Sequence, residues 1–417
     1  MMKKTAIFLC LLLAAHVGLN AQSGTYDAIM ADLRLSDGVH TMYPEGQAAP
    51  TPAPRGYKPF YISHLGRHGA RFALGSTAYG DQWAVWSSAH EKGILTQEGE
   101  EIFQAYAQLY PLVKNREGNL TQKGQEQHRR IAREMYRNYP AVFKGDTKAR
   151  AVSTGVHRVI VSMYSFLGQL AELDKDFSYW ADYGYPYQDY LLPKVIDMPN
   201  SWPQEVVDKF NAFADGRIHL SATLQRWFTD LSVIADAYRF LEQLHVVYGT
   251  LDNLDVPVPE KLKHIFTPDE LYNLWLVNNY DEYLRLGLSS EVENIRPASM
   301  TALLTDIALK ADEAVAGGPV RLDLRFAHDS TLAPVLSRLD VNGMGYRTAD
   351  PLALQEHWRT FDIPMACNLQ LIFFRSRKSP DILVQVLLNG REATLPLEMA
   401  APGSFYRWTD VSALLRR

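Results

Sequence analysis

Short apolar and β-branched runs alternate along this chain with longer segments of helical periodicity, and this alternation limits the folds open to it. Residues 57–64, 148–153 and 320–327 have the composition of buried strands, and helical patterns occupy residues 96–112, 121–139, 156–173 and 331–339. Two further runs, 368–374 and 382–388, predict neighbouring strands. Strands that alternate with helices favour a mainly parallel sheet covered by helices on both faces. We therefore expect an α/β core.

Residues 166–304 differ from the rest of the chain. They show almost no strand pattern and are rich in aromatic and aliphatic residues at helical spacing. We interpret them as an inserted all-α cap domain, with residues 22–165 and 305–417 forming the α/β core. The insertion holds 10 basic and 21 acidic residues, a net charge of −11, whereas the whole chain carries −5. The cap is therefore acidic and the remainder mildly basic. The net negative charge of the whole chain argues against a nucleic-acid partner, whose binding surface is normally basic.

The first 21 residues predict a secretory signal peptide. Lys3 and Lys4 precede a brief apolar run over residues 6–15, and Ala21 provides the small residue before a cleavage site. The run is too short to span a bilayer, so we expect no membrane span after signal removal and a periplasmic or secreted location in a bacterium. Beyond the signal, Cys367 is the only cysteine, which excludes an intramolecular disulfide.

The first cluster of reactive side chains directly follows a predicted strand. Arg67 and Arg71 flank His68, and Gly66 and Gly69 allow the backbone to turn sharply there. Guanidinium groups stay charged and bind phosphate through two parallel hydrogen bonds. A histidine between two arginines is disfavoured as a cation, so we expect His68 to be neutral and nucleophilic. Surface ion pairs of the two arginines are the alternative interpretation.

Two more clusters follow strands in the same way. Arg158 lies in the first turn of a predicted helix after Ser153, where it can reach a phosphate held at the strand ends. His157 beside it is expected to be an exposed residue at the helix start. His328 and Asp329 follow the strand 320–327, and they supply a phosphate ligand and an acid for proton transfer. An aspartate before a helix can also be a simple N-cap.

Taken together, the three clusters are more specific than any one of them. Ligands of open α/β sheets bind at the carboxyl ends of the strands, so side chains from the three ends are expected to meet. Such a group suits transfer of a phosphoryl group to a histidine, which requires mainly positioning and neutralisation of the phosphate oxygens. The candidate residues are Arg67, His68, Arg71, Arg158, His328 and Asp329.

These motifs resemble the histidine phosphatase superfamily, in its acid phosphatase branch of phytases, glucose-1-phosphatases and multiple inositol polyphosphate phosphatases. The similarity runs in order through Arg67–Arg71, the helix start at 120–128, Ser153-Thr154 leading to Arg158, and His328-Asp329. The resemblance implies a phosphoglycerate-mutase-like core with an inserted helical domain and no metal or other cofactor. It also implies His68 as nucleophile, Asp329 as proton donor, and Arg67, Arg71, Arg158 and His328 as phosphate ligands.

The chain departs from the family pattern at two places. Ala73 stands where the family often has proline, which changes nothing chemical. His328-Asp329-Ser330 stands where the inositol polyphosphate phosphatases carry His-Ala-Glu, and this form matches acid phosphatases and bacterial phytases instead. His157 before Arg158 resembles the inositol branch, so the sequence leaves the branch open.

Other candidate sites are weaker. His64 and His68 stand four residues apart like zinc ligands, but the glycines between and after them disfavour a helix. A sugar-binding wall and core or cap packing are alternative roles for five aromatic residues, with packing favoured: Trp83, Trp86, Tyr179, Trp180 and Tyr185.

Two functions from different classes remain. The first is an exported phosphomonoesterase acting on small organic phosphates, either sugar phosphates or inositol phosphates such as phytate. The second is a non-catalytic phosphate-binding protein that keeps the arginine pocket. A nucleophile and an acid favour the enzyme, because a binder needs neither. The cap's acidity does not suggest a surface for a highly phosphorylated substrate, although Lys194, Arg217 or Lys263 could supply basic groups locally. The oligomeric state cannot be inferred.

Overall fold

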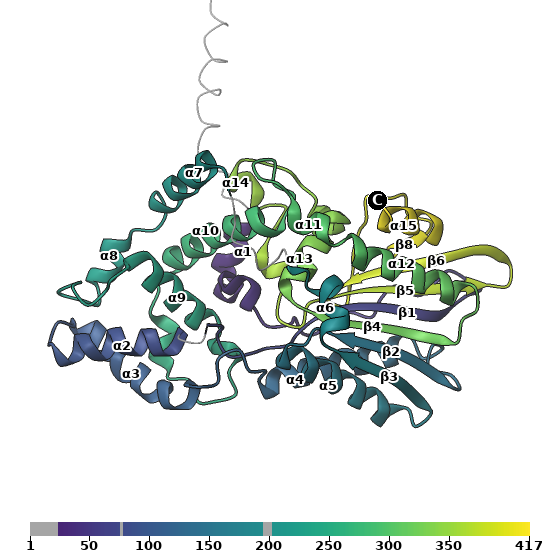
Figure 1. Cartoon of the computed structure of the whole chain (residues 1–417), viewed down its shortest axis with the longest axis horizontal. Helices are drawn as coiled ribbons and strands as arrows, with labels where there is room; N and C mark the ends of the chain where they lie inside the picture. The colour runs from purple at the N-terminus through teal and green to yellow at the C-terminus, as the bar shows by residue number, and fades with distance from the viewer. Residues whose placement is uncertain (1–23, 76–77, 195–201) are drawn as a thin grey trace, which may run out of the picture.

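The structure is a computed structural model that describes residues 24–75, 78–194 and 202–417 (Figure 1). The predicted signal peptide, residues 1–21, lies outside the described residues. In the described part of the chain, no helix combines the length and the apolarity needed to cross a membrane.

The described residues form one mixed sheet of eight strands, in the order β3-β2-β4-β1-β5-β6-β7, with β8 beside β6. Strands β3, β2, β4 and β1 are parallel, and β5 to β8 add antiparallel pairs at the other side. The predicted α/β class is confirmed. The strands are β1 Tyr57–Arg67, β2 Thr147–Ser153, β3 Phe177–Tyr183, β4 Val320–Ala327, β5 Asn368–Ser376, β6 Ser379–Leu388, β7 Arg391–Glu392 and β8 Phe405–Arg407.

Helices cover both faces of the sheet (Figure 1). Residues along each strand alternate between the two faces, so each face contributes apolar side chains to a different cluster. Ile62 of β1 packs in the cluster that includes α4 and α5, whereas Tyr61 and Leu65 pack in the cluster that includes α12, α13 and α15. Both faces are therefore buried, as a parallel sheet requires. These helices are α4 Gln122–Asn138, α5 His157–Leu173, α12 Thr301–Val315, α13 Asp329–Arg338 and α15 Trp408–Leu415.

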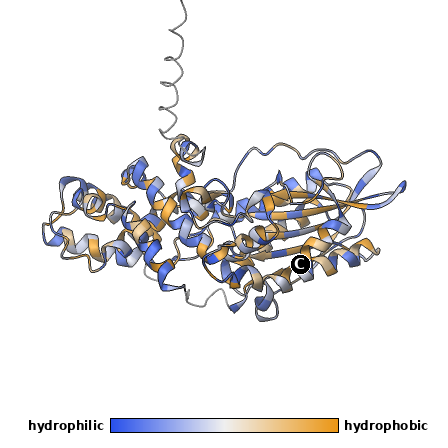
Figure 2. Ribbon diagram, turned by 90° about the horizontal axis from the view of Figure 1, so that it is seen from above, coloured by the Kyte–Doolittle hydropathy of each residue, from blue (hydrophilic) through white to orange (hydrophobic). Residues whose placement is uncertain are grey.

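Most of the remaining helices gather beyond the strand ends, on the left in Figure 1, whereas α6 lies against the sheet near β2 and β4. Figure 2 shows the same separation from above. Two of the remaining helices, α2 and α3, precede residue 166 in the chain but share one apolar cluster with α8, α9 and α10. The helices are α1 Gly24–Ala31, α2 Ala78–Glu91, α3 Gln97–Val113, α6 Tyr185–Leu191, α7 Gln204–Asp215, α8 Leu220–Gln225, α9 Ala237–Gly249, α10 Pro268–Leu286, α11 Ile295–Ser299 and α14 Pro351–Leu354, with the 3-10 helix η1 Leu33–His40.

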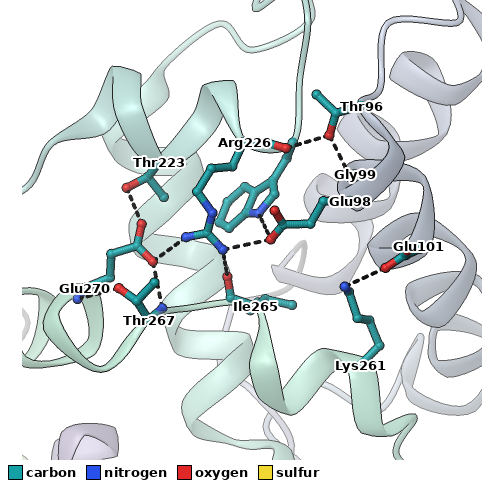
Figure 3. Close-up of polar contacts among 11 residues, drawn as sticks. Thr96, Glu98, Gly99, Glu101, Thr223, Arg226, Lys261, Ile265, Thr267 and Glu270 are labelled. Atoms are coloured by element: carbon teal, nitrogen blue, oxygen red, sulfur yellow. Dashed lines mark hydrogen bonds and ion pairs between the residues drawn. The ribbon is translucent and has the colours of Figure 1, made fainter.

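Arg226 ties these two chain segments together (Figure 3). Its guanidinium donates to Glu98 of α3 at 2.8 Å and to Glu270 of α10 at 2.6 Å. Lys261 forms a second link, 2.7 Å from Glu101. The helical region therefore comprises α2 and α3 in addition to helices from residues 166–304.

One strand was missed in the segment predicted to be helical. β3 pairs in parallel with β2 and forms the edge of the sheet, with Tyr179 and Trp180 largely exposed at 43% and 53%. Only Phe177 of this strand is buried, so the strand lacks the apolar alternation by which a half-buried strand is recognised. Its aromatic residues instead resembled the helical pattern that follows.

Substitution of Gly124 tests the close packing between helix α4 and the loop that follows β1. A Cβ at this position would lie 2.3 Å from the Ala70 carbonyl oxygen, closer than any real contact. We expect Gly124→Ala to lower the free energy of unfolding by at least about 2 kcal/mol, measured by urea denaturation, because backbone must move to admit the methyl group.

Gly168 of α5 is the matched control, since a Cβ there meets nothing within 4 Å. Gly168→Ala should raise stability by about 0.5–1 kcal/mol, because alanine is the better helix former. Equal effects of the two substitutions would contradict this account of Gly124.

Candidate active site

Three parallel strands end side by side at one edge of the sheet. Arg67 at the end of β1 pairs with Ala327 at the end of β4, and Ser153 at the end of β2 pairs with Phe326. The main chain of His68 continues this register, because its N–H donates to the Ala327 carbonyl at 3.1 Å. Its own carbonyl accepts from the N–H of Ala366 at 2.9 Å. The backbone of His68 is therefore fixed from both sides.

Side chains of α4 and α5 hold the loop that follows. The N–H of Gly69 donates to Ser162 Oγ at 3.1 Å, and the N–H of Ala70 donates to Gln127 Oε1 at 2.8 Å. A buried backbone N–H group that lost its acceptor would lower the stability of the fold. The loop geometry therefore depends on polar side chains of the sheet-covering helices.

The ring of His68 is buried and has a defined tautomer. Its Nδ1 lies 3.0 Å from the Gly69 carbonyl oxygen, which can only accept a hydrogen bond, so Nδ1 carries the proton and Nε2 keeps its lone pair. Burial lowers the pKa of His68 well below its ordinary value, and Arg67, Arg158 and Arg71 lower it further. The imidazole is therefore neutral, as the sequence predicts.

Arg67 is fully buried and held by three acceptors. Its Nη1 donates to the carbonyl oxygens of Val39 at 2.5 Å and Ile363 at 2.8 Å, and its Nη2 donates to Asp329 Oδ2 at 2.5 Å. Burial alone would raise the pKa of Asp329, but Arg67 and Arg71 outweigh it and hold that pKa well below its ordinary value. Asp329 is thus an ionised carboxylate in this state.

Arg71 is also buried, and η1 supports it. Its Nη1 donates to the Phe72 carbonyl at 3.0 Å, and its Nη2 lies 3.4 Å from Nε2 of His40. Burial and the neighbouring Arg67 lower the pKa of Arg71 to about 9, which still leaves it charged at neutral pH. Burial and Arg71 keep the pKa of His40 well below its ordinary value, so this imidazole is a neutral acceptor.

The remaining two candidates complete the group. His328 Nε2 lies 3.1 Å from Thr154 Oγ1, and the His328 ring centroid lies 5.7 Å from that of His68. Arg158 is half-buried, and its charge acts on both Asp329 and His68. The structure therefore brings together all six residues that the sequence singles out. His157 is exposed, as expected for a residue at the helix start.

Three guanidinium groups against one carboxylate give this site an excess of positive charge. Within the described residues, the buried Nε atoms of Arg67, Arg71 and Arg158 have no hydrogen-bond partner. Buried donors are normally satisfied, so the site is built to receive an acceptor. A phosphate group supplies several acceptor oxygens and up to two negative charges, and it fits both requirements.

A cavity of about 550 Å³ is lined by two of the six candidate residues, Arg71 and Asp329. Ser330 also lines it, and α9 and α10 supply many of the other lining residues. A larger cavity of about 1110 Å³ contains none of the six candidate residues. The smaller cavity is therefore the one that the chemistry selects.

Several weaker candidates do not reach the cavity. His64 contacts Phe166 and Phe326 in the core, so it does not share a site with His68. Among the described residues, no group of three or more His, Cys, Asp or Glu side chains is arranged to hold a metal ion. The cavity lining includes none of the five aromatic residues considered for a sugar-binding wall, as far as the structure describes it: Trp83, Trp86, Tyr179, Trp180 and Tyr185.

Sequence reasoning missed the groups that support the site. His40 and the Val39 carbonyl act from a segment almost thirty residues before the motif, and no local pattern marks them. Thr154 and Gln127 lie inside motifs that the sequence identifies, but only their contacts give them a role. The signal that the sequence offered for Thr154 and Gln127 was their position within these motifs.

Comparisons with known proteins agree with this geometry. Residues 62–215 match the model of the histidine phosphatase superfamily (branch 2). The fold is similar to that of Bifidobacterium longum multiple inositol polyphosphate phosphatase in complex with inositol hexasulfate, with a TM-score of 0.70 and 18% identity over 91% of this chain and 97% of that chain. The phytase from D. castellii aligns with a TM-score of 0.69 and 14% identity over 92% and 84%. No curated protein sequence matches.

A third similar structure is the Citrobacter braakii phytase, with a TM-score of 0.56 and 14% identity over 86% of this chain and 97% of that chain. The resemblance to the histidine phosphatase superfamily is thus confirmed by the family model, and the solved structures confirm the fold. At these identities the similarity extends to the fold and not to the substrate.

Glu282 in the cavity wall allows a test of the local electrostatics. Burial and the neighbouring Asp281 raise the pKa of Glu282 from 4.5 to about 7. Between these values the folded state binds more protons than the unfolded state, so this group's contribution to stability falls as pH rises through that window. We expect Glu282→Gln to be more stable than wild type at pH 8, by roughly 1–3 kcal/mol.

The two proteins should differ much less near pH 5. Urea unfolding of both at the two pH values measures the difference. A stability difference that is independent of pH would contradict a raised pKa for Glu282.

Proposed function

We propose that this protein is a phosphomonoesterase that works through a phosphohistidine at His68. The observation that carries the proposal is a neutral imidazole with a free Nε2 lone pair inside a cluster of three arginines. In the proposed first step, Arg67, Arg71, Arg158 and His328 bind the phosphate oxygens. These cationic and hydrogen-bonding groups stabilise the charge on the transferring phosphoryl group.

The chemistry proceeds in two balanced steps. Nε2 of His68 attacks phosphorus, a P–N bond forms, and the P–O bond to the alcohol breaks with its electron pair leaving on oxygen. Asp329 gives a proton to that oxygen, so a neutral alcohol departs. Water then attacks the phosphohistidine, Asp329 takes a proton from the water, and inorganic phosphate leaves with His68 regenerated.

The ion pair between Arg67 and Asp329 determines where the proton for the leaving alcohol must come from. In the free site Asp329 is ionised, so the proton must arrive with the substrate as a phosphate monoanion or be taken from acidic solution. Phosphate oxygens compete for the guanidinium of Arg67, and this weakens the interaction that lowers the pKa of Asp329. The second ionisation of a phosphate ester lies near pH ~6. The rate constant kcat/KM is therefore expected to fall above that pH.

Two finer assignments belong to the same proposal. Export to the periplasm or medium is supported by the signal-like sequence of residues 1–21. A substrate-facing role for the helical cap, residues 166–304, is supported by the cavity, whose wall includes residues of α9 and α10. We propose that the side chains at the carboxyl ends of β1, β2 and β4 bind the phosphate and that the cap contacts the alcohol.

The nucleophile is tested by hydrolysis of p-nitrophenyl phosphate at pH 5. His68→Ala should reduce kcat by at least about a thousandfold, because the proposed covalent intermediate forms on the Nε2 atom that this substitution removes. Circular dichroism should show that the variant is folded. Equal rates of hydrolysis by variant and wild type would end the phosphohistidine proposal, whereas no hydrolysis by wild type would favour a phosphate-binding protein.

The acid is tested by changing the leaving group. Asp329→Asn should slow hydrolysis of an alkyl phosphate by roughly a hundredfold or more, since an alkoxide leaves poorly without a proton. Hydrolysis of p-nitrophenyl phosphate should fall much less, because p-nitrophenolate leaves without assistance. If both substrates lost rate equally, Asp329 would not be the proton donor.

A further inference from the structure

Apart from Arg71 and Asp329, which form its phosphate end, the cavity has an acidic lining. Asp281, Glu282 and Arg285 line the cavity from α10, and Arg285 is a surface neighbour of both carboxyl groups because it stands four residues after Asp281 and three after Glu282. Glu242 of α9 and Asp37 of η1 add two more carboxyl groups from separate elements. The acidic wall, defined as Asp37, Glu242, Asp281 and Glu282, therefore draws on three elements of the fold.

Basic groups in the cavity do not balance this wall. Arg285 forms an ion pair with Asp281 at 2.8 Å, and Arg296 of α11 is the other guanidinium beyond the phosphate end, as far as the structure describes the lining. Four carboxyl groups thus face two guanidinium groups. Lys194, Arg217 and Lys263, which the sequence suggests as local basic groups, are absent from the described lining, and Lys263 is paired with Glu260 instead.

The carboxyl groups also interact with one another and with the phosphate end. The pKa of Glu242 is raised by burial and then by Asp281, and the pKa of Glu282 is raised by burial, by Asp281 and by Asp329. Carboxylates held close together in a partly buried wall repel further anions and are relieved by a hydrogen-bond donor or a cation. The phosphate-binding arginines and the acidic wall therefore favour ligand groups of opposite charge.

We propose that this cavity selects monophosphate esters whose alcohol carries hydrogen-bond donors, an ammonium group above all, and rejects polyphosphorylated alcohols. The proposal rests on the phosphomonoesterase function and narrows it to a substrate class. One phosphate binds at Arg67, Arg71 and Arg158, and the alcohol points toward the acidic wall. A second phosphate on the alcohol would meet carboxylates there, whereas an amine or hydroxyl group would donate to them.

The experiment compares kcat/KM within two matched substrate pairs at pH 8, where Glu282 is ionised although its pKa is raised to about 7. Glucosamine 6-phosphate and glucose 6-phosphate differ by an ammonium group, and myo-inositol 1-phosphate and myo-inositol hexakisphosphate differ by additional phosphates. We expect wild type to favour glucosamine 6-phosphate by at least about threefold and the inositol monophosphate by at least about tenfold. Preference for the hexakisphosphate, or no preference in either pair, would overturn the proposal.

The double variant Glu242→Gln/Glu282→Gln tests whether the wall causes the selectivity. Removing two carboxylates without changing their size should reduce both ratios at least about threefold. Glu293→Gln is the matched control, because Glu293 is exposed and lies outside the described cavity lining. Ratios that stay at the wild-type value in the double variant, or that fall equally in the control, would overturn the assignment to the acidic wall.

p-Nitrophenyl phosphate separates this proposal from the one it rests on. If wild type hydrolyses neither this ester nor any of the four substrates, the proposed phosphomonoesterase function itself fails. If wild type hydrolyses p-nitrophenyl phosphate but shows the reverse selectivity, only the substrate class is wrong. The wild-type ratios alone decide this, so the result does not depend on the folding of the variants.

Discussion

A neutral imidazole placed among guanidinium groups is the constraint on which the rest of this structure depends. Arg67 and Arg71 are buried, and their charge together with burial keeps His68 unprotonated. Burying such charges is costly unless they are paired or hydrogen-bonded. The protein offsets this cost with the carboxylate of Asp329 and the carbonyl groups of Val39 and Ile363. A bound phosphate would neutralise the remaining positive charge, so that the groups that bind the substrate also stabilise the transferring phosphoryl group.

The supporting structure is arranged to keep this cluster rigid. The backbone of His68 is bonded to β4 on one side and to the Ala366 amide on the other. Gly69 and Gly124 allow the loop after β1 to approach α4 more closely than any side chain would permit. His40, at the end of the 3-10 helix η1, contacts Arg71 and helps to hold its side chain in place. A nucleophile positioned by backbone contacts loses little orientational freedom when substrate binds.

Much of this arrangement could be predicted from the sequence because it is local. The strand before His68, the strand 320–327 and the helix that begins at His157 are marked by apolar runs and turn residues within a few positions. The convergence of the motifs followed from a general property of parallel sheets rather than from any single motif. The six candidate residues therefore meet where the pattern indicated.

The features that escaped prediction depend on contacts between distant parts of the chain. Strand β3 is an exposed edge whose aromatic residues do not alternate in burial, so its pattern was ambiguous. Helices α2 and α3 join the helical region through Arg226, more than a hundred residues away. The acidic wall combines residues from η1, α9 and α10, which only the folded chain brings to one cavity. The composition indicated that the cap is acidic, but it did not indicate which of the acidic side chains line the cavity.

Covalent phosphorylation of His68 during turnover is the most direct test of this account. The protein is mixed with a 32P-labelled phosphomonoester at pH 5, quenched within milliseconds in alkali, digested, and its labelled peptide sequenced. The account predicts up to one phosphoryl group per chain, stable to alkali and labile to acid, on the peptide that contains His68. Rapid hydrolysis that leaves no label on the protein, or label on a different residue, would contradict it.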